Sequence, residues 1–466
     1  MSKHFDIAVL GGGPGGYVAA IRASQLGFKT VVIDKDNLGG VCLNWGCIPT
    51  KSLLKNAEHY DNLKNNSEEF GLKVEGLSFD FNKIIKRSRG IAERISKNVE
   101  LLIKKNKIER IKGFGKLISN NKVEVSFENG NKEEITAENI IVATGARPRF
   151  LPNIPVDRKS IITSSEAMTL EKLPKSLIVV GAGAIGVEFA YFYSVLGTKV
   201  TIIEMLDQIL PIEDKEVSET LEKSFKKRGI EIFTGTKVVK AEIEKEDVKV
   251  TIDKNGEIKE LRAEKVLNAI GVVGNIENIG LEELGVETYK NSIVVDRENY
   301  STNVKGIYAI GDVIGAPWLA HVASSEGITC VEKIKGLHTT KVDYENIPGC
   351  TYCQPQVASI GLTEQKAKEK GYDLKIGKFP FMASGKAFAI GERDGFVKLI
   401  FDAKYGELLG AHIIGSEATE MIAELGLAKA LEATPEAIIK TMHAHPTLSE
   451  SIMEAAANAL SESIHI

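Results

Sequence analysis

The sequence predicts an α/β fold in which one strand–helix–strand unit occurs twice. The segment Ile7–Asp34 aligns without gaps on Leu177–Glu204 at a constant offset of 170 residues, and ten of the 28 aligned pairs are identical. Each copy begins with an apolar, β-branched run, continues with apolar residues at helical spacing, and returns through a glycine to a second apolar run that ends in an acid. We therefore expect two βαβ units.

Glycines and acids stand at equivalent positions in the two copies. Each copy reads Gly-x-Gly-x-x-Gly after its first strand: the first glycine allows a tight turn, the second lets the backbone approach a pyrophosphate, and the third lets the helix pack closely on the sheet. Each acid follows 23 residues after the first glycine, where a carboxylate can accept hydrogen bonds from a ribose diol. The residues are Gly11, Gly13, Gly16 and Asp34 in the first copy and Gly181, Gly183, Gly186 and Glu204 in the second.

This spacing favours two Rossmann-like dinucleotide sites over two accidental turns. A carboxylate at Glu204 would repel a 2′-phosphate, and no Arg follows it, so the second site should prefer NAD to NADP. Two such sites in one chain suggest that one dinucleotide is a fixed flavin and the other a nicotinamide that exchanges.

Length and composition predict a globular protein with several domains. The 466 residues exceed the usual domain size of about 100–200 residues, so we expect two to four domains. The 43% hydrophobic and 26% charged content is ordinary, and a net charge of −4 provides no basic footprint for nucleic acid. The apolar run before the first glycines is too short for a secretory signal, and no later run could span a membrane. We expect a cytoplasmic protein with neither nucleic-acid nor membrane partners.

The stretch GGVCLNWGCIPTK (Gly39–Lys51) places Cys42 and Cys47 five positions apart in a chain with five cysteines. So few cysteines cannot form a disulfide framework, and in a reducing compartment a close pair more often indicates redox or metal chemistry. Dithiol–disulfide exchange needs one thiolate to attack and a second thiol to resolve the mixed disulfide. Gly39 and Gly40 let the chain turn, and we expect a helix to follow whose N–H groups favour the thiolate. Burial as two small apolar residues is the alternative.

The second close pair, Cys350 and Cys353 in IPGCTYCQPQ, is weaker evidence for chemistry. A single C-x-x-C without another pair or a nearby His seldom binds zinc, so we interpret these residues as structural and expect no metal site.

Two further fragments are typical of strands that end beside a ligand. IIVATGARPRF (Ile140–Phe150) predicts a strand that ends at Ala143-Thr144-Gly145, and GIYAIGDVIG (Gly306–Gly315) predicts a strand that opens through Gly311 and Asp312 into a helix. Asp312 could bond a ligand hydroxyl or could be a plain helix N-cap, and the local sequence does not choose between them.

The C-terminal segment HAHPTLSE (His443–Glu450) contains a candidate proton acceptor. A histidine titrates near neutral pH, and a carboxylate can hold the ring and stabilise its cation. Pro446 interrupts any helix, so a loop could present His445 while Glu450 caps the helix that follows. His443 lies two residues earlier on the same face of an extended segment, and the spacing does not choose between the two.

Taken together, the chain resembles the flavin-dependent pyridine nucleotide–disulfide oxidoreductases, and among them the dihydrolipoamide dehydrogenases, along essentially its whole length. The motifs that carry the resemblance are GGGPGGY, GGVCLNWGCIPTK, ATGARP, GAGAIGVEFA, YAIGD and HAHPTLSE. Relatives more often have small residues in place of Trp45 and Thr50, which we interpret as tolerated variation close to the flavin.

The resemblance implies four segments: residues 1–150 and 276–345 form an FAD domain, 151–275 an NAD domain, and 346–466 an α+β interface domain that makes a homodimer. It implies that Cys42 meets the substrate, that Cys47 lies against the flavin as a charge-transfer thiolate, and that His445 with Glu450 moves the proton. His445 would face the cysteines of the other subunit. The expected cofactor-binding residues are Gly11, Gly13, Gly16, Asp34, Lys51, Gly115, Thr144, Gly145, Gly181, Gly183, Gly186, Glu188, Glu204, Gly271, Asp312 and Ala320.

The function that this resemblance implies is NAD-dependent oxidation of protein-bound dihydrolipoyl groups through FAD. The partners would be lipoyl domains of 2-oxo acid dehydrogenase complexes or the H protein of glycine cleavage. Glutathione and mercuric reductases share the fold, but the C-terminus AAANALSESIHI lacks the cysteine pair of mercuric reductases, and Glu204 disfavours an NADP-driven reductase. A flavin-bearing binding subunit without turnover is the alternative from another class. A surface ion pair is the alternative for Lys51 with Glu188.

Overall fold

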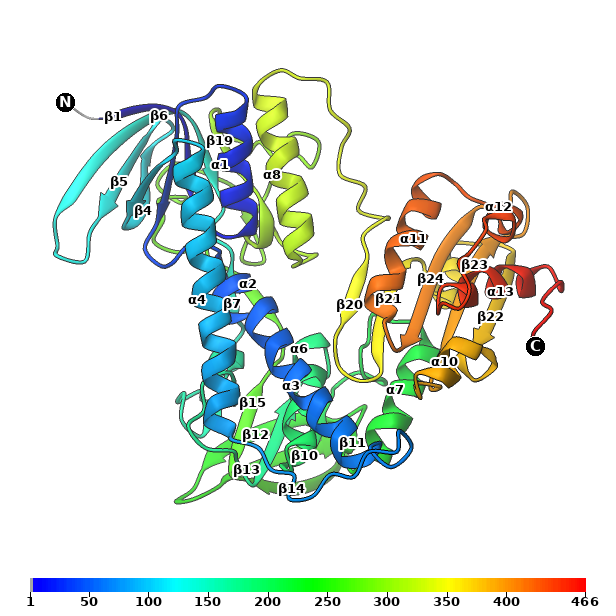
Figure 1. Cartoon of the computed structure of the whole chain (residues 1–466). Helices are drawn as coiled ribbons and strands as arrows, with labels where there is room; N and C mark the ends of the chain where they lie inside the picture. The colour runs from blue at the N-terminus through cyan, green and yellow to red at the C-terminus, as the bar shows by residue number, and fades with distance from the viewer. Residues whose placement is uncertain (1–2) are drawn as a thin grey trace. The chain divides into compact units, whose positions relative to one another are not determined.

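The structure is a computed structural model that describes residues 3–466 and divides into two compact units. The first unit contains the chain up to Ser52, Lys83–Arg149 and Gly271–Val342; the second contains Leu53–Asn82, Phe150–Ile270 and Asp343–Ile466. Both are mixed α/β, which confirms the predicted fold class (Figure 1). The division of the chain into FAD, NAD and interface domains stays a prediction. In the described part of the chain, no helix has the length and apolar composition needed to cross a membrane.

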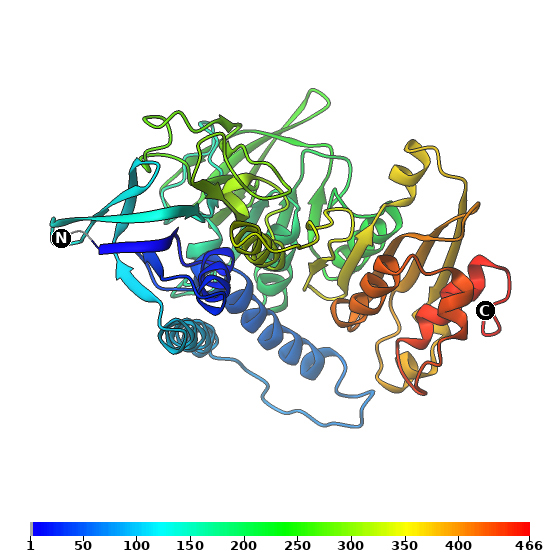
Figure 2. The same cartoon turned by 90° about the horizontal axis from the view of Figure 1, so that it is seen from above.

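A seven-stranded sheet with the order β3-β2-β1-β6-β5-β4 forms the centre of the first unit, and β19 also pairs with β6. The strands β3, β2, β1, β6 and β19 are parallel, whereas β5 and β4 extend the sheet as an antiparallel hairpin. Helices α1 and α8 lie side by side in both views (Figures 1 and 2). The inner strands are buried along most of their length, as expected of parallel strands that are covered on both faces.

The elements that build the first unit are β1 (Lys3–Leu10), α1 (Pro14–Gln25), β2 (Thr30–Asp34), α2 (Gly40–Trp45), α3 (Cys47–Asn65), α4 (Phe81–Lys105), β3 (Glu109–Lys112), β4 (Phe114–Ser119), β5 (Lys122–Ser126), β6 (Lys132–Val142), β7 (Ala146–Pro148), β16 (Val272–Gly274), β17 (Thr288–Tyr289), β18 (Ser292–Ile293), β19 (Ile307–Ala309), η1 (Gly311–Ile314) and α8 (Ala320–Ile334). Both α3 and α4 cross the boundary between the units.

The second unit repeats this arrangement in a five-stranded parallel sheet with the order β11-β10-β9-β15-β8. The unit β9-α6-β10 corresponds to β1-α1-β2, and each central strand is flanked in the same way, so the predicted βαβ repeat is confirmed. Strands β12, β13 and β14 form a separate antiparallel sheet. The bounds are β8 (Ile161–Ile162), α5 (Ser164–Ala167), β9 (Ser176–Val180), α6 (Ala184–Val195), β10 (Lys199–Ile203), α7 (Lys215–Lys227), β11 (Glu231–Phe233), β12 (Lys237–Ile243), β13 (Val248–Lys254), β14 (Glu257–Ala263) and β15 (Lys265–Asn268).

The C-terminal part of the second unit is an antiparallel sheet with the order β20-β21-β24-β23-β22. Side chains alternate along each strand, so Val397 and Leu399 of β23 pack in a core with residues of α11 and α13. The bounds are β20 (Gly349–Thr351), β21 (Gln356–Gly361), α9 (Glu364–Glu369), β22 (Leu374–Pro380), η2 (Phe381–Ala383), α10 (Gly385–Ala389), β23 (Phe396–Asp402), β24 (Leu408–Gly415), α11 (Ala418–Ala430), α12 (Pro435–Lys440) and α13 (Glu450–Ala459).

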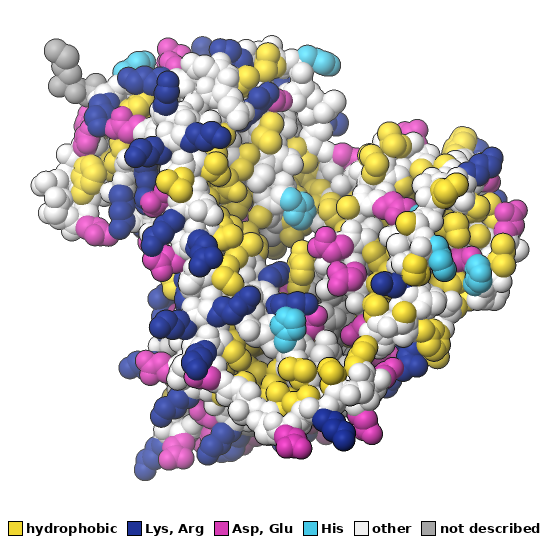
Figure 3. Space-filling model, in the orientation of Figure 1, with side chains coloured by type: hydrophobic (Ala, Val, Ile, Leu, Met, Phe, Trp, Pro, Cys, Tyr) yellow, Lys and Arg dark blue, Asp and Glu magenta, His cyan; other side chains and the backbone are white. Residues whose placement is uncertain are grey.

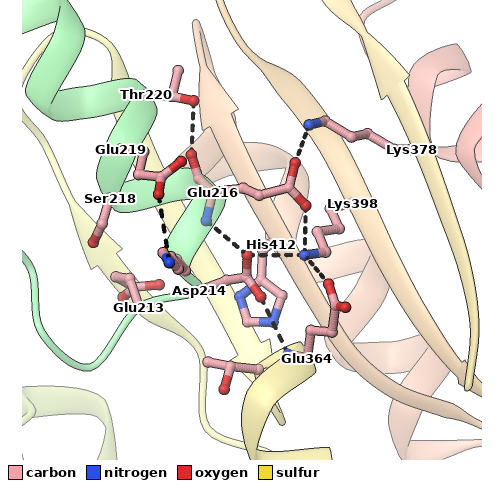
Figure 4. Close-up of polar contacts among 12 residues, drawn as sticks. Glu213, Asp214, Glu216, Ser218, Glu219, Thr220, Glu364, Lys378, Lys398 and His412 are labelled. Atoms are coloured by element: carbon pink, nitrogen blue, oxygen red, sulfur yellow. Dashed lines mark hydrogen bonds and ion pairs between the residues drawn. The ribbon is translucent and has the colours of Figure 1, made fainter. Parts of the chain in front are cut away.

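The same alternation directs Lys398 to the other face of this sheet, where it joins α7 and α9 (Figure 4). Its side chain is 1% exposed, and Nζ lies 3.0 Å from Asp214, 2.8 Å from Glu216 and 2.7 Å from Glu364. Burial alone would lower the pKa of Lys398, but hydrogen bonds with the three carboxylates raise it above its ordinary value. A buried charge needs such partners, so this cluster ties α7 firmly to the C-terminal sheet.

Lys and Arg side chains gather along α4 on the face drawn in Figure 3. Lys97 of this helix lies 2.7 Å from Glu93, and Arg110 of β3 contacts Glu100 of α4. Exposed ion pairs of this kind contribute little stability, so they are typical of a solvated helix face.

Candidate active site

The first glycine loop joins β1 to α1 and depends on close backbone contacts. Gly11 has a φ of +108°, and a Cβ at this residue would lie 2.2 Å from the carbonyl oxygen of Ala143. A Cβ on Gly16 would lie 1.9 Å from the carbonyl oxygen of Gly11, so α1 can approach the turn only with glycine there. Gly13 is the N-cap of α1, which presents backbone N–H groups to an anion.

The second glycine loop, between β9 and α6, repeats these contacts. Gly181 has a φ of +100°, and a Cβ on Gly186 would lie 2.0 Å from the carbonyl oxygen of Gly181. Gly183 is the N-cap of α6, and apart from the adjoining residues of its own loop and helix, no atom of residues 3–466 lies within 4 Å of the position that its Cβ would occupy. This open position beside a helix N-terminus fits the close approach of a pyrophosphate, so the residues present suit a dinucleotide.

Each predicted acid binds its own glycine loop. Asp34 Oδ2 accepts a hydrogen bond from Gly12 N at 2.6 Å, and Glu204 Oε2 accepts one from Ala182 N at 2.7 Å. Burial raises the pKa of Asp34, against the opposing effect of its backbone hydrogen bonds. Glu204 is only 8% exposed. Both carboxylates are therefore held at the end of the second strand, where the sequence spacing placed them.

Strands β1, β6 and β19 end at one edge of the first sheet. Ala143 N donates to Leu10 O at 2.8 Å, and Ile310 N donates to Val142 O at 3.0 Å. Residues that follow parallel strands meet at such an edge, which is where open α/β sheets bind ligands. The sequence-predicted residues that the structure brings to this edge are Gly11, Thr144, Gly145 and Asp312.

Asp312 lies inside the 3-10 turn η1. The N-cap of η1 is Ile310, so the interpretation of Asp312 as a plain N-cap is wrong. The strand does lead through Gly311 and Asp312 into a helix, but this is the short 3-10 helix η1, and α8 begins only at Ala320. Burial and the charge of Glu326 raise the pKa of Asp312 to about 6.

The cysteine pair lies beside the first glycine loop. Gly39 N donates to Gly12 O at 2.7 Å, and Gly39 and Gly40 have φ values of +98° and +56°, which confirms the expected turn. Cys42 is the third residue of the short helix α2, and Cys47 is the first residue of α3. The turn that leads into the dithiol therefore contacts the first glycine loop within one unit.

The expectation that a helix N-terminus favours the thiolate does not hold for Cys42. A hydrogen bond with Cys47, burial and the charge of Cys47 raise the pKa of Cys42, against the opposing charge of Lys51. The negative charge of Cys47 disfavours a second negative charge on Cys42, so deprotonation of one cysteine opposes deprotonation of the other.

His445 and Glu450 contact each other as predicted. His445 Nδ1 lies 2.9 Å from Glu450 Oε1, and the histidine side chain is 80% exposed. Burial opposes ionisation of Glu450, but hydrogen bonds from Thr447 N and His445 lower its pKa below the ordinary value. The N-cap of α13 is Ser449, so Glu450 does not cap that helix; it begins the helix and binds Thr447 N in the preceding loop.

His443 has its own carboxylate, 2.7 Å from Nε2, in Glu424. Its side chain is 5% exposed, compared with 80% for His445. The structure thus distinguishes the two histidines, which the sequence alone could not do. His443 is buried against a helix, and His445 is exposed at the surface.

The remaining predicted positions are divided between the units. Lys51 lies on α3 in the first unit, one turn after Cys47. Glu188 lies on α6 in the second unit, where it is 4% exposed and its Oε1 accepts a hydrogen bond from Tyr352 N at 2.9 Å. The ion-pair alternative for these two residues stays untested.

Three further predicted residues stand at element ends. A Cβ on Gly115 of β4 would lie 2.8 Å from Leu10, which brings Gly115 to the same sheet edge as the first glycine loop. Gly271 has a φ of +105° and follows β15 after two residues, and Ala320 is the first residue of α8.

Comparisons with known proteins identify the family. Residues 5–327 match the model of "Pyridine nucleotide-disulphide oxidoreductase", and residues 347–456 match the dimerisation domain of the same group. The chain belongs to the pyridine nucleotide-disulphide oxidoreductase family. Its C-terminal part is the family's dimerisation domain, which supports a homodimer.

Relatives within the pyridine nucleotide-disulphide oxidoreductases match the whole chain. The dihydrolipoyl dehydrogenase of Zymomonas mobilis is 49% identical and that of Bacillus subtilis 46%, each with complete coverage of both chains. Among solved structures, LpdA of Mycobacterium tuberculosis has a TM-score of 0.90 at 28% identity, over 97% of this chain and 99% of that one. The HOCl-induced flavoprotein disulfide reductase RclA of Escherichia coli, solved as a Cu(II) complex, has a TM-score of 0.88 at 25% identity, over 98% and 99%.

The sequence analysis missed Asn44, which holds the turn before the cysteines. Its Nδ2 donates to Leu38 O at 3.1 Å and to Gly40 O at 3.0 Å. An asparagine inside a short predicted helix was the available signal, because asparagine seldom favours a helix interior unless its side chain bonds the backbone. Trp45, expected beside the flavin, is 42% exposed and stacks on the guanidinium of Arg89 at 4.2 Å.

Proposed function

We propose that this protein oxidises protein-bound dihydrolipoyl groups to the lipoyl disulfide and passes the electrons through FAD to NAD, as a dihydrolipoyl dehydrogenase. The observation that carries the proposal is the contact between the Gly39-Gly40 turn and the first glycine loop, which puts dithiol chemistry beside a dinucleotide site. Full-length similarity to enzymes named dihydrolipoyl dehydrogenase supports the substrate class. FAD and NAD are the cofactors of the family.

The first glycine loop would hold FAD and the second NAD. When bound, FAD supplies the two-electron chemistry that links dithiol oxidation to hydride acceptance by NAD. The residues proposed to hold FAD are Gly11, Gly13, Gly16, Asp34, Lys51, Gly115, Thr144, Gly145, Asp312 and Ala320. Those proposed to hold NAD are Gly181, Gly183, Gly186, Glu188, Glu204 and Gly271.

Cys42 and Cys47 carry the exchange. A thiolate of the dihydrolipoyl group attacks Cys42 in the Cys42–Cys47 disulfide, which forms a mixed disulfide and releases Cys47 as a thiolate. The second lipoyl thiolate then attacks the lipoyl sulfur of the mixed disulfide, closes the lipoyl ring and releases Cys42. The substrate loses two electrons and two protons: the cysteine pair gains the two electrons, His445 accepts one proton, and the other proton leaves to solvent.

His445 accepts the substrate proton. A neutral thiol is a poor nucleophile near pH 7, and an imidazole titrates in that range. Glu450, 2.9 Å from Nδ1, orients the ring and stabilises the imidazolium, which leaves Nε2 to take the proton. The low pKa of Glu450 keeps this carboxylate charged at neutral pH.

We further propose that His445 acts on the cysteine pair of the other subunit. Its ring is 80% exposed and lies within residues 347–456, the part that matches the dimerisation domain. Chains with Cys47→Ser and chains with His445→Ala should each be inactive as homodimers. A heterodimer, isolated through two different tags, should recover about half the activity of the normal dimer because one site inherits both lesions and the other neither. A doubly tagged heterodimer as inactive as its parents would place His445 within its own chain.

The physiological partners follow from the substrate. We propose lipoyl domains of 2-oxo acid dehydrogenase complexes or the glycine cleavage H protein as electron donors. We propose a cytoplasmic location, because five cysteines in 466 residues are typical of a reducing compartment.

The direct test is reduction of NAD by dihydrolipoamide. Glutathione disulfide, mercuric ion and Cu(II), each supplied with NADH or NADPH, are the matched alternatives. We expect turnover with dihydrolipoamide and NAD to exceed the others by at least about a hundredfold in kcat/KM. Faster turnover of a reductase substrate with NADPH would contradict the assignment.

A further inference from the structure

The turn that carries Asp312 is held at both ends by one ion pair. Glu326 of α8 accepts a hydrogen bond from Gly311 N, the first residue of η1, at 2.7 Å. Arg297 donates to the carbonyl oxygen of Ile314, the last residue of η1, at 2.9 Å. The two side chains meet at 3.3 Å between Arg297 Nη1 and Glu326 Oε1. The pair therefore spans η1 from start to end.

Glu326 is suited to this position because its surroundings are fixed. Its side chain is 2% exposed, and a buried carboxylate is costly unless it is paired and hydrogen-bonded. One residue further along α8, Gly327 meets α1: a Cβ there would lie 2.7 Å from the carbonyl oxygen of Gly15. Close packing at Gly327 thus sets the distance between Glu326 and the helix that follows the first glycine loop.

Gly311 completes the arrangement. It has a φ of +71°, a left-handed conformation that glycine adopts readily, and a Cβ there would lie 3.1 Å from Cβ of Ala323 on α8. The turn is consequently pressed against α8 on one side and hydrogen-bonded to Glu326 at its first N–H.

We propose that Glu326 and Arg297 are a positioning pair that fixes η1 and aims Asp312 at a hydroxyl group of the dinucleotide bound at the first glycine loop. This inference rests on the proposed binding of FAD at that loop. The charged and titratable groups around the turn are Glu326 and Cys330 on α8 and Arg297 in the loop before β19. The charge of Glu326 also contributes to the raised pKa of Asp312.

A matched control lies on the same helix. Glu332 of α8 accepts two hydrogen bonds from Arg22 of α1, at 2.9 Å from Nε and 2.6 Å from Nη2. This pair also joins α8 to α1, but none of its hydrogen bonds reaches η1. Glu332→Gln therefore removes a comparable interaction between the helices without touching the turn.

The test is the affinity of flavin-free protein for FAD, read from the change in flavin fluorescence on binding, from about pH 5 to 8. Glu326→Gln should raise the Kd for FAD about tenfold or more, because a charged acceptor and its ion pair are lost together. The pH dependence should shift to lower pH, because loss of the negative charge lowers the pKa of Asp312. Arg297→Lys keeps a charge but cannot reach both Glu326 and Ile314 with one planar fork, so it should weaken FAD binding to a smaller extent.

Glu332→Gln should leave both the Kd and its pH profile at the wild-type values. The inference is overturned when Glu326→Gln and Arg297→Lys bind FAD as tightly as wild type, or when Glu332→Gln weakens FAD binding equally. Failure of wild-type flavin-free protein to bind FAD at all would instead remove the proposed function on which the inference rests.

Discussion

The two glycine loops have the same backbone conformation but differ in the residues that cover them. In the first, Gly39 N bonds Gly12 O, and the missing Cβ of Gly13 would lie 3.8 Å from Cα of Gly40. In the second, apart from the adjoining residues of its own loop and helix, nothing in residues 3–466 lies within 4 Å of the corresponding position on Gly183.

The helices that follow the loops differ in the same direction. Gly15 of α1 packs against Ala323 of α8, whose carbonyl oxygen would lie 3.1 Å from an added Cβ. Ile185, the equivalent residue of α6, is 41% exposed. The glycine loop of the first βαβ unit is therefore covered by neighbouring residues, whereas that of the second is open. A covered site suits a cofactor that stays, and an open site suits one that exchanges.

Loss of a cysteine should produce the largest effect, and this effect should be confined to the covered site. Cys47→Ser should lower kcat with dihydrolipoamide about a thousandfold or more, because no second thiol remains to complete the exchange. FAD content, measured by absorbance after gel filtration, should stay at about one per chain. Cys350→Ser, which changes a half-buried cysteine outside the candidate site, should keep wild-type turnover. Comparable losses in both variants would contradict a special role for the Cys42–Cys47 pair.

A methyl group on the open loop should separate binding from folding. In Gly183→Ala the new methyl group contacts nothing outside its own loop and helix, and the φ of −70° is allowed for alanine. The free energy of unfolding, measured by thermal melting, should therefore change by no more than about 1 kcal/mol. The KM for NAD should rise about tenfold to a hundredfold, because the new methyl group occupies the space for the pyrophosphate. In Gly186→Ala the Cβ would lie 2.0 Å from Gly181 O, so that variant should lose stability as well. Normal NAD kinetics in Gly183→Ala would mean that the open position is not the pyrophosphate site.

A change of the second acid should weaken the preference for NAD over NADP. Glu204→Gln keeps an oxygen for Ala182 N or Leu206 N but loses the charge. The KM for NAD should rise about tenfold, and that for NADP should fall, because repulsion of the 2′-phosphate is relieved. Steady-state kinetics with both cofactors measures this ratio. An unchanged ratio in Glu204→Gln would show that this carboxylate does not select the nicotinamide.

Sequence reasoning succeeded where a contact is short-range and repeated. The glycine turns, the two acids and the Gly39-Gly40 turn follow from local backbone requirements, and each occupies its expected place. The contact between His445 and Glu450 was also within reach, because they are only five positions apart and Pro446 interrupts the helix.

Sequence reasoning failed for side chains whose interaction partner is distant in the chain. Glu326 meets Arg297 across a turn and Lys398 meets Asp214 across 184 residues, and no local pattern pairs them. The pKa of Cys42 was also misjudged, because the hydrogen bond with Cys47 outweighs any effect of a helix N-terminus. Which histidine is exposed depends on how α11 packs, since Glu424 of that helix holds His443.

A pH-dependent effect on stability is expected in the segment that links the open loop to the C-terminal sheet. Burial raises the pKa of Glu213 to about 7, above an ordinary value near 4.5. The unfolded chain therefore loses this proton first, and ionisation of Glu213 destabilises the folded protein as pH rises from about 4.5 to 7. Glu213→Gln should remove this slope of up to about 1.4 kcal/mol per pH unit. Urea unfolding at several pH values measures it, and equal slopes in the two proteins would show that Glu213 titrates normally.

The central claim is that the covered site takes electrons from the dithiol and the open site delivers them to NAD. Rapid mixing, followed by flavin absorbance, tests this with two variants. In Cys47→Ser, NADH should reduce the flavin and dihydrolipoamide should not. In Gly183→Ala, dihydrolipoamide should reduce the flavin at the wild-type rate, whereas reduction by NADH at low concentration should be at least about tenfold slower. Loss of both half-reactions in either variant would contradict the division of labour between the two sites.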